Sequence, residues 1–159
     1  MRPCTLLKLW APLVLACAAC GHSDPNARSP VNKAMQDSIL PIRQLAAGLY
    51  GGPAEPVEAV ISSAQELTSL WPGSDVPAVD FAREMVVFVA LGERRTGGYS
   101  VEVTSATVSG DTLVVRYVER QPGPGCLTTQ ALTTPFHAVA IPHVQATPRF
   151  QRELVRVPC

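Results

Sequence analysis

Two neighbouring stretches of the chain alternate apolar and polar positions, which is the pattern of strands that bury one face. In the first stretch, residues 99–108, the face predicted to be buried carries Tyr99, Val101, Val103 and Ser105. Gly110-Asp111 then marks a tight turn, and residues 112–119 (TLVVRYVE) return as the partner strand. The pattern therefore predicts a β-hairpin.

Other segments predict further strands. Residues 84–91 (EMVVFVAL) form a nearly continuous apolar run, which indicates a strand buried on both faces. Shorter strands are predicted at 57–61, 134–142 and 150–157. Residues 38–46 (SILPIRQLA) contain Pro41, which is unfavourable inside a helix, so this segment is predicted to be an irregular edge strand.

One short helix is expected between two of these strands. Ser63-Ala64-Gln65-Glu66 matches a capping box, in which the serine hydroxyl and the glutamate carboxylate bind amides at a helix start. The helix should run over residues 63–70 and bury Leu67 and Leu70. Short strands separated by turns, with one short helix, predict a β-rich α+β fold, either a mostly antiparallel sandwich or a partly closed barrel.

The N-terminal residues have the organisation of a lipoprotein signal peptide, predicted over residues 1–19. Arg2 and Lys8 supply positive charge, and the apolar stretch that follows is too short for a transmembrane helix. It ends on cysteines rather than on an A-x-A site, which resembles a lipobox. An ordinary signal peptide cleaved near Ala19, or a plain hydrophobic N-terminus, is the alternative.

Cys20 is the predicted lipid anchor because two alanines precede it and a glycine follows it, and Cys17 is the alternative. Residues 20–33, which are polar and contain prolines, would form the lipidated cysteine and a flexible tether. Residues 34–159 would form the β-rich domain. By resemblance to other lipoproteins, glycine rather than aspartate after the anchor favours the outer membrane. The expected location is the bacterial cell envelope, with the domain facing the periplasm.

Cys126 and Cys159 remain after the N-terminal segment. In an oxidising compartment they most simply form one disulfide, which closes a ring of about 34 residues; two unpaired thiols are the alternative. The chain holds 13 basic and 13 acidic residues, and this balance argues against nucleic acid as a partner. The lipid is the only membrane attachment that the sequence supports.

Little in the sequence indicates catalysis or a metal site. A nucleophile elbow, an H-E-x-x-H motif and nucleotide-binding glycine patterns are all missing. His137 and His143 are close in sequence, but two histidines alone make a poor zinc site. Glu102 and Glu119 are candidates to face each other across the hairpin, although acids on a sheet face are usually solvated. We therefore predict a protein that is not an enzyme, with no cofactor, no metal and no small-molecule substrate.

The most distinctive segment is a glycine-rich loop between two predicted strands, residues 92–101 (GERRTGGYSV). Its glycines accommodate positive φ, its tyrosine has an apolar ring with a polar tip, and its arginines suit carboxylates or backbone carbonyls. The residues predicted to contact a protein partner are Arg94, Arg95, Thr96, Gly97, Gly98 and Tyr99. A plain glycine turn with solvated arginines is the alternative.

Taken together, four stretches resemble the PrcB C-terminal-like domain: VDFAREMVV at 79–87, GERRTGGYSV at 92–101, VERQPG at 118–123 and TPFHAVAIP at 134–142. The resemblance spans about residues 60–142, with Arg95 standing where the family usually has proline. The family is named for a lipoprotein component of a bacterial surface protease complex, thought to bind and stabilise the protease. The resemblance implies a protein partner and no catalytic residues.

A weaker resemblance is to chagasin-like inhibitors of cysteine peptidases, small β-sandwiches that insert a T-T-G-Y loop into the peptidase cleft. Residues 96–99 are similar to that loop, and the loop at 122–125 is expected beside it. The leading hypothesis is a non-catalytic, membrane-anchored lipoprotein that binds a protein partner and stabilises or modulates a secreted protease. A peptidase inhibitor, and a structural envelope lipoprotein without a protease partner, are the alternatives.

Overall fold

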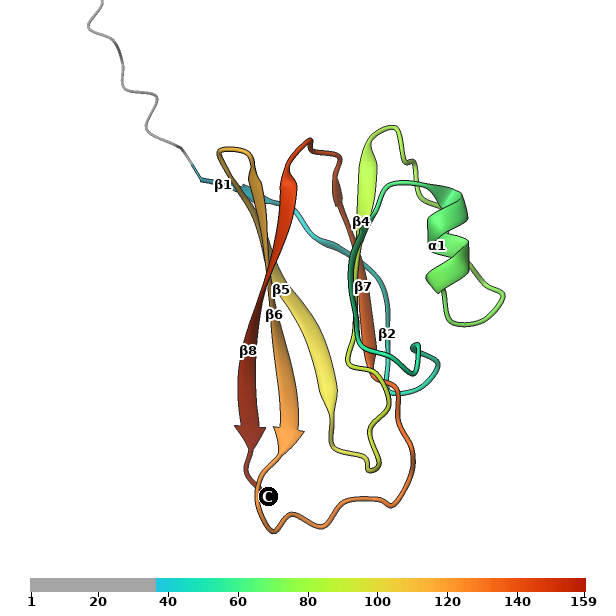
Figure 1. Cartoon of the computed structure of the whole chain (residues 1–159), viewed down its shortest axis with the longest axis vertical. Helices are drawn as coiled ribbons and strands as arrows, with labels where there is room; N and C mark the ends of the chain where they lie inside the picture. Colours follow the sequence, from blue (N-terminus) through green and yellow to red (C-terminus); the bar gives the residue numbers. More distant parts are fainter. Residues whose placement is uncertain (1–36) are drawn as a thin grey trace, which may run out of the picture. The chain divides into compact units, whose positions relative to one another are not determined.

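The computed structural model of the protein contains two four-stranded sheets (Figure 1). The structure describes residues 37–159. The predicted signal peptide, the lipidated cysteine at Cys20 or Cys17, the tether and the start of the domain at residue 34 lie outside the described residues.

The first sheet has the strand order β1-β5-β6-β8, and the second has the order β2-β7-β4-β3. The strands of the first sheet are β1 (Ser38–Leu40), β5 (Ser100–Ser109), β6 (Thr112–Pro122) and β8 (Thr147–Val157). Those of the second sheet are β2 (Arg43–Gly48), β7 (Phe136–Pro142), β4 (Glu84–Ala90) and β3 (Val57–Ile61). Every neighbouring pair is antiparallel except β6–β8, which is parallel. The predicted β-rich α+β fold is confirmed, and a sandwich describes it rather than a barrel.

Strand β4 is buried on both faces, as its apolar sequence predicts. Met85, Val87 and Val89 pack into the core between the two sheets. Val86 and Phe88, on the opposite face, belong to a second cluster that includes Leu67 of the helix α1 (Ala64–Leu70). Figure 1 shows α1 on the side of the second sheet that faces away from the first sheet. The helix and the segment after it thus cover a sheet face that solvent would otherwise reach.

The capping box is present at the start of α1. Ser63 is the N-cap, and its hydroxyl accepts a hydrogen bond from the Glu66 amide at 3.3 Å. The Glu66 carboxylate accepts one from the Ser62 amide at 3.4 Å, one residue before the amide that the motif predicts. No helix within residues 37–159 is long and apolar enough to cross a membrane.

The segment predicted to be an irregular edge strand is divided between the two sheets. β1 lies at the edge of the first sheet and β2 at the edge of the second, with Pro41 and Ile42 between them. Proline lacks an amide and cannot continue a ladder, so the chain leaves one sheet at this point and joins the other. The edge-strand prediction is confirmed.

The alternation predicted for β5 holds only over its first half. Val101 and Val103 are buried, but the register with β6 shifts between Val103 and Ser105. Beyond this β-bulge Ala106 is fully buried and Ser105 is only partly buried. The prediction that Ser105 faces the core is wrong, because one extra residue at the bulge reverses the order of the faces.

Candidate functional site

Three loops meet at the end of the sandwich where β6 and β8 terminate (Figure 1). We call them the loop platform: residues 49–56, 91–99 and 123–135. The third loop lies against the second, because Arg94 and Thr133 exchange backbone hydrogen bonds of 2.8 and 2.9 Å. The Gly97 amide also donates to the Thr129 carbonyl at 3.0 Å.

Backbone hydrogen bonds also join the third loop to the first. The Thr134 amide donates to the Leu49 carbonyl at 2.9 Å, and the Gly52 amide donates to the Thr134 carbonyl at 3.1 Å. The Thr133 hydroxyl, on a residue that is 2% exposed, donates to the Thr96 carbonyl. Because backbone groups of all three loops bind one another, the platform is a connected layer rather than three independent loops.

A disulfide joins Cys126 to Cys159 and confirms the predicted pairing. It connects the loop between β6 and β7 to the C-terminal residue, which follows β8. The longest loop of the platform is therefore fixed covalently as well as by hydrogen bonds.

The glycines of the second loop have separate roles. Gly98 has a φ of 87°, a conformation that favours glycine, and it lies against Pro122, so the loop at 122–125 stands beside it as expected. Gly97 has no positive φ, contrary to the expectation for both glycines. At Gly97 a Cβ would collide with the Thr129 hydroxyl, so close approach of the neighbouring loop requires glycine there.

The residues predicted to contact a partner differ in exposure. Arg95 and Gly98 are exposed, whereas Arg94, Thr96, Gly97 and Tyr99 are partly buried. Tyr99 packs against the core between the sheets. The platform also exposes apolar side chains that the sequence did not single out: Leu49 (47%), Tyr50 (62%), Leu127 (104%) and Leu132 (61%).

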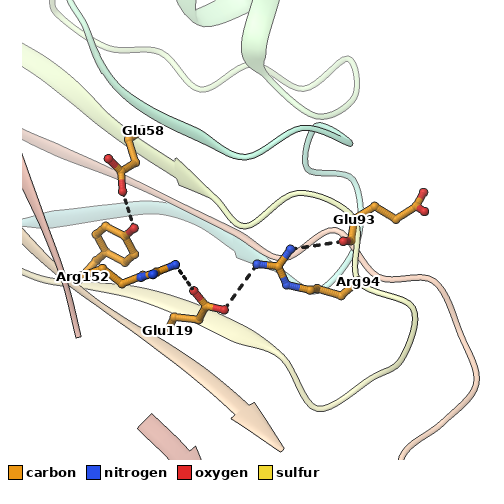
Figure 2. A network of polar contacts seen from close by, with 6 residues as sticks. Glu58, Glu93, Arg94, Glu119 and Arg152 are labelled. Carbon is orange, nitrogen blue, oxygen red and sulfur yellow. Dashed lines mark hydrogen bonds and ion pairs between the residues drawn. The ribbon is translucent and has the colours of Figure 1, made fainter. Parts of the chain in front are cut away.

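Arg94 takes part in a network of charged residues below the platform (Figure 2). Its Nη2 lies 3.4 Å from Oε1 of Glu119, and its Nη1 donates to the Glu93 carbonyl at 3.3 Å. Its guanidinium also lies 5.6 Å from the centre of the Tyr99 ring, within the range of a cation–π interaction. The alternative of solvated arginines therefore holds for Arg95 but is wrong for Arg94.

Glu119 is the centre of this network. It is 5% exposed, and its second carboxylate oxygen lies 3.4 Å from Nη1 of Arg152 on β8. Figure 2 shows the carboxylate between the two arginines. A buried carboxylate needs such partners, since an unpaired charge is costly away from water.

A second polar contact connects the two sheets. The Tyr117 hydroxyl of β6 donates to the Glu58 carboxylate of β3. Burial and the adjacent Glu58 carboxylate raise the pKa of Tyr117 above its usual range, so the phenol stays protonated and remains a donor. These residues line a groove of about 330 Å³, which we call the polar groove: Pro56, Glu58, Ala90, Leu91, Arg94, Tyr117, Glu119 and Arg152.

The predicted approach of Glu102 to Glu119 across the hairpin is wrong. Glu119 is opposite Val101, and Glu102 instead forms an exposed ion pair with Arg120 at 2.8 Å. Glu119 follows Leu113, Val115 and Tyr117 at intervals of two residues, on the buried face of β6. That spacing could have predicted that Glu119 is buried. Nothing in the sequence predicted that Glu58 or Arg152 would lie near it.

His137 is buried and forms a hydrogen bond within the domain. It is 5% exposed, and its Nδ1 accepts a hydrogen bond of 2.8 Å from the Val103 amide beside the β5 bulge. Burial lowers the pKa of His137, although Glu102 acts in the opposite direction. His143 lies beyond β7 and is exposed. Within residues 37–159 no group of His, Cys, Asp and Glu side chains is arranged to hold a metal ion.

The two packed sheets with connected loops at one end define a β-sandwich domain. Residues 85–142 match the family model described as PrcB C-terminal, which supports a PrcB C-terminal-like domain in this part of the chain. The matched residues run from β4 to β7 and include two of the three platform loops. No curated protein and no solved structure gives a significant match to the chain.

Proposed function

We propose that this protein is a non-catalytic, membrane-anchored lipoprotein that binds an exported protease through the loop platform and stabilises or modulates it. The observation that carries the proposal is the platform itself, in which connected loops present Leu49, Tyr50, Leu127 and Leu132 to solvent. Exposed apolar side chains on a preorganised surface are typical of protein interfaces. The family match supports a partner associated with a protease complex.

The contacts of the ionisable residues support a binding role rather than catalysis. The ring nitrogen Nδ1 of His137 is engaged by a backbone amide, and the Glu119 carboxylate lies between two arginines. General acid–base chemistry needs a group that can reach a substrate proton. These groups instead hold the domain together.

The partly buried positions in the second loop favour a flat contact over insertion into a peptidase cleft. Thr96 and Gly97 are held by the neighbouring loop, through the Thr96 and Thr129 carbonyls. An inhibitor that inserts residues 96–99 would need them to project from the surface. Inhibition therefore remains the alternative, and an activity assay separates it from stabilisation.

The test is affinity capture from an extract of the host envelope, with the full chain as bait. Leu132→Ser and Arg95→Glu alter exposed platform residues, whereas Ile39→Ser alters an exposed residue of β1, away from the platform. We expect a peptidase, identified by mass spectrometry, to be captured by the wild type and by Ile39→Ser but not by the platform variants. Equal capture by all baits would refute the platform as the binding site.

A captured peptidase then allows the second step. Its activity and its lifetime at 37 °C are measured with and without a stoichiometric amount of the protein. Longer lifetime at unchanged initial rate indicates a stabiliser, and loss of the initial rate indicates an inhibitor. If no peptidase is captured at all, the hypothesis that remains is a structural envelope lipoprotein without a protease partner.

The membrane anchor is a separate part of the proposal. It rests on the small residues before Cys20 and on the apolar stretch before them. Cys20→Ser should release the protein from the membrane fraction, whereas Cys17→Ser should leave it there. The mass of the N-terminal peptide checks the result directly, and a peptide without a diacylglycerol group would contradict lipidation. Outer-membrane fractions are the expected location.

A further inference from the structure

Strand β8 is paired along only one of its edges. It is the last strand of the first sheet, it is 11 residues long, and it lies parallel to β6 over its whole length. Among residues 37–159, no strand pairs with its other edge. Such an edge exposes amides and carbonyls that can bind an added strand.

The register shows which residues present these groups. At one end of β8 the Thr147 amide donates to the Asp111 carbonyl at 2.8 Å, and at the other the Val157 carbonyl accepts from the Gly123 amide at 2.9 Å. Odd-numbered residues therefore face β6, and since neighbouring residues of a strand alternate, even-numbered residues direct their backbone groups outward. These residues are Pro148, Phe150, Arg152, Leu154 and Arg156. Proline has no amide to donate, so Pro148 fits this assignment.

The charge of β8 favours an acidic partner segment. It carries Arg149, Arg152 and Arg156 against the single acidic residue Glu153, and all four are exposed. Within the described residues only Arg152 of these forms an ion pair, with Glu119. A second copy of β8 would bring the same arginines together, whereas acidic side chains on an added strand would pair with them.

The polar groove lies beside this edge, between β8 and β3. Arg152 belongs to both, and Glu58 of β3 lines the opposite side. A strand added to β8 would direct alternate side chains toward the groove, whose volume of about 330 Å³ is large enough to receive a side chain. The open edge and the groove are thus two parts of one surface.

We propose that the β8 edge and the polar groove bind an extended acidic segment of a partner protein, which adds to the first sheet as a fifth strand. The proposal deepens the proposed function by giving a second contact surface and the chemistry of the bound segment. It depends on the proposed function only for the statement that the bound segment belongs to the protein partner. The binding surface itself is independent, because residues 147–157 are not part of the loop platform. Main-chain hydrogen bonds would supply affinity, and arginines would select for acidic residues.

The test uses the purified full chain and two peptides of about ten residues, one alternating valine with glutamate and the other alternating valine with lysine. Binding is measured by fluorescence anisotropy, and amide protection by hydrogen exchange. We expect the acidic peptide to protect the amides of Phe150, Arg152, Leu154 and Arg156, and the basic peptide to leave them unchanged.

Two substitutions at one position provide the matched comparison. Leu154→Pro removes an outward amide without removing a bond to β6, whereas Leu154→Ala shortens the side chain and keeps the amide. Loss of one hydrogen bond should weaken binding by about two- to tenfold in Leu154→Pro relative to Leu154→Ala. Thermal unfolding checks that both variants fold. If Leu154→Pro does not, Arg149→Glu with Arg156→Glu is used instead, and it should reverse the preference between the two peptides.

Several results would overturn the proposal. Equal binding of both peptides, equal binding by the two Leu154 variants, or protection of the edge amides through dimerisation of the chain itself would each do so. Leu132→Ser should bind the acidic peptide like the wild type. Equal peptidase capture by the wild type and Leu132→Ser, with the acidic peptide still bound, would therefore count against the loop platform alone. Loss of capture in Leu132→Ser, with no binding of the acidic peptide by the wild type, would count against the β8 edge alone.

Discussion

Arg94 holds its loop in place, in addition to being a candidate contact for a protein partner. Its backbone pairs with Thr133, its guanidinium binds Glu119, and its charge lies over the Tyr99 ring. One side chain thus connects the loop platform to the polar groove. Arg95, the next residue, is exposed, so two adjacent arginines of the same sequence motif have different roles.

Glu119→Ala should lower the free energy of unfolding by about 1–3 kcal/mol, because it leaves Arg94 and Arg152 without the carboxylate that they share. Urea unfolding measures the change. Glu102→Ala is the matched control on the neighbouring strand, and loss of its exposed pair with Arg120 should cost less than about 0.5 kcal/mol. Similar losses in the two variants would contradict the importance of the buried network.

His137 should make stability depend on pH. Its pKa is lowered by burial, so the unfolded chain takes up a proton as the pH falls below about 6.5 while the folded protein resists it. The contribution of neutral His137 is therefore fully present above that pH and is lost below it, by up to about 1.4 kcal/mol per pH unit. Urea unfolding at pH 7.5 and pH 5 measures the slope. His137→Gln should reduce it, and His143→Gln is the control; equal slopes in both variants would refute the assignment.

Among the elements, α1 and β8 differ in how they are held. The helix contributes Leu67 to the cluster on the outer face of the second sheet, where Val86 and Phe88 are fully buried. β8 is held by its ladder with β6 and leaves most of its side chains exposed. The helix therefore serves to cover the sheet, whereas β8 retains an edge that is available for binding.

Ser63→Ala should destabilise the protein by about 1 kcal/mol, because the Glu66 amide loses its N-cap acceptor. Thermal unfolding or urea titration provides the measurement. Ser69→Ala, in the last turn of the same helix, removes a hydroxyl that only supplements the helix and should be close to neutral. An equal effect of the two substitutions would show that the cap does not contribute.

In the molecule as a whole, the disulfide links the two proposed binding surfaces. Cys126 lies in the loop platform, and Cys159 is the second residue after β8. β8 runs parallel to β6, so both strands end at the platform and the C-terminus lies there. In an antiparallel pairing, the start of β8 would lie at the platform instead.

Cys126→Ser should lower the free energy of unfolding by about 3–4 kcal/mol, as expected for opening a ring of this length. Urea titration with and without a thiol reductant checks the result. The reductant should destabilise the wild type by a similar amount and leave the variant unchanged. A wild type indifferent to the reductant under unfolding conditions would contradict the contribution of the bridge.

The local elements are predictable from the amino-acid sequence, because their signals lie within a few residues. The apolar run of β4, the hairpin around Gly110-Asp111 and the cap at Ser63 follow from periodicity and turn chemistry, and the disulfide follows from the pairing of two remaining cysteines. The family resemblance likewise arose from contiguous motifs.

The contacts between residues far apart in the sequence become visible only in the folded domain. Glu58, Glu119 and Arg152 come from three strands, and their contacts depend on the order and register of those strands, which no local pattern encodes. The bulge that moves Ser105 out of the core lies next to the Val103 amide, which donates to His137 of the other sheet, so this contact too joins residues far apart in the sequence. The individual elements were therefore predictable along the chain, whereas the platform, the polar groove and the open edge of β8 exist only once the two sheets are assembled.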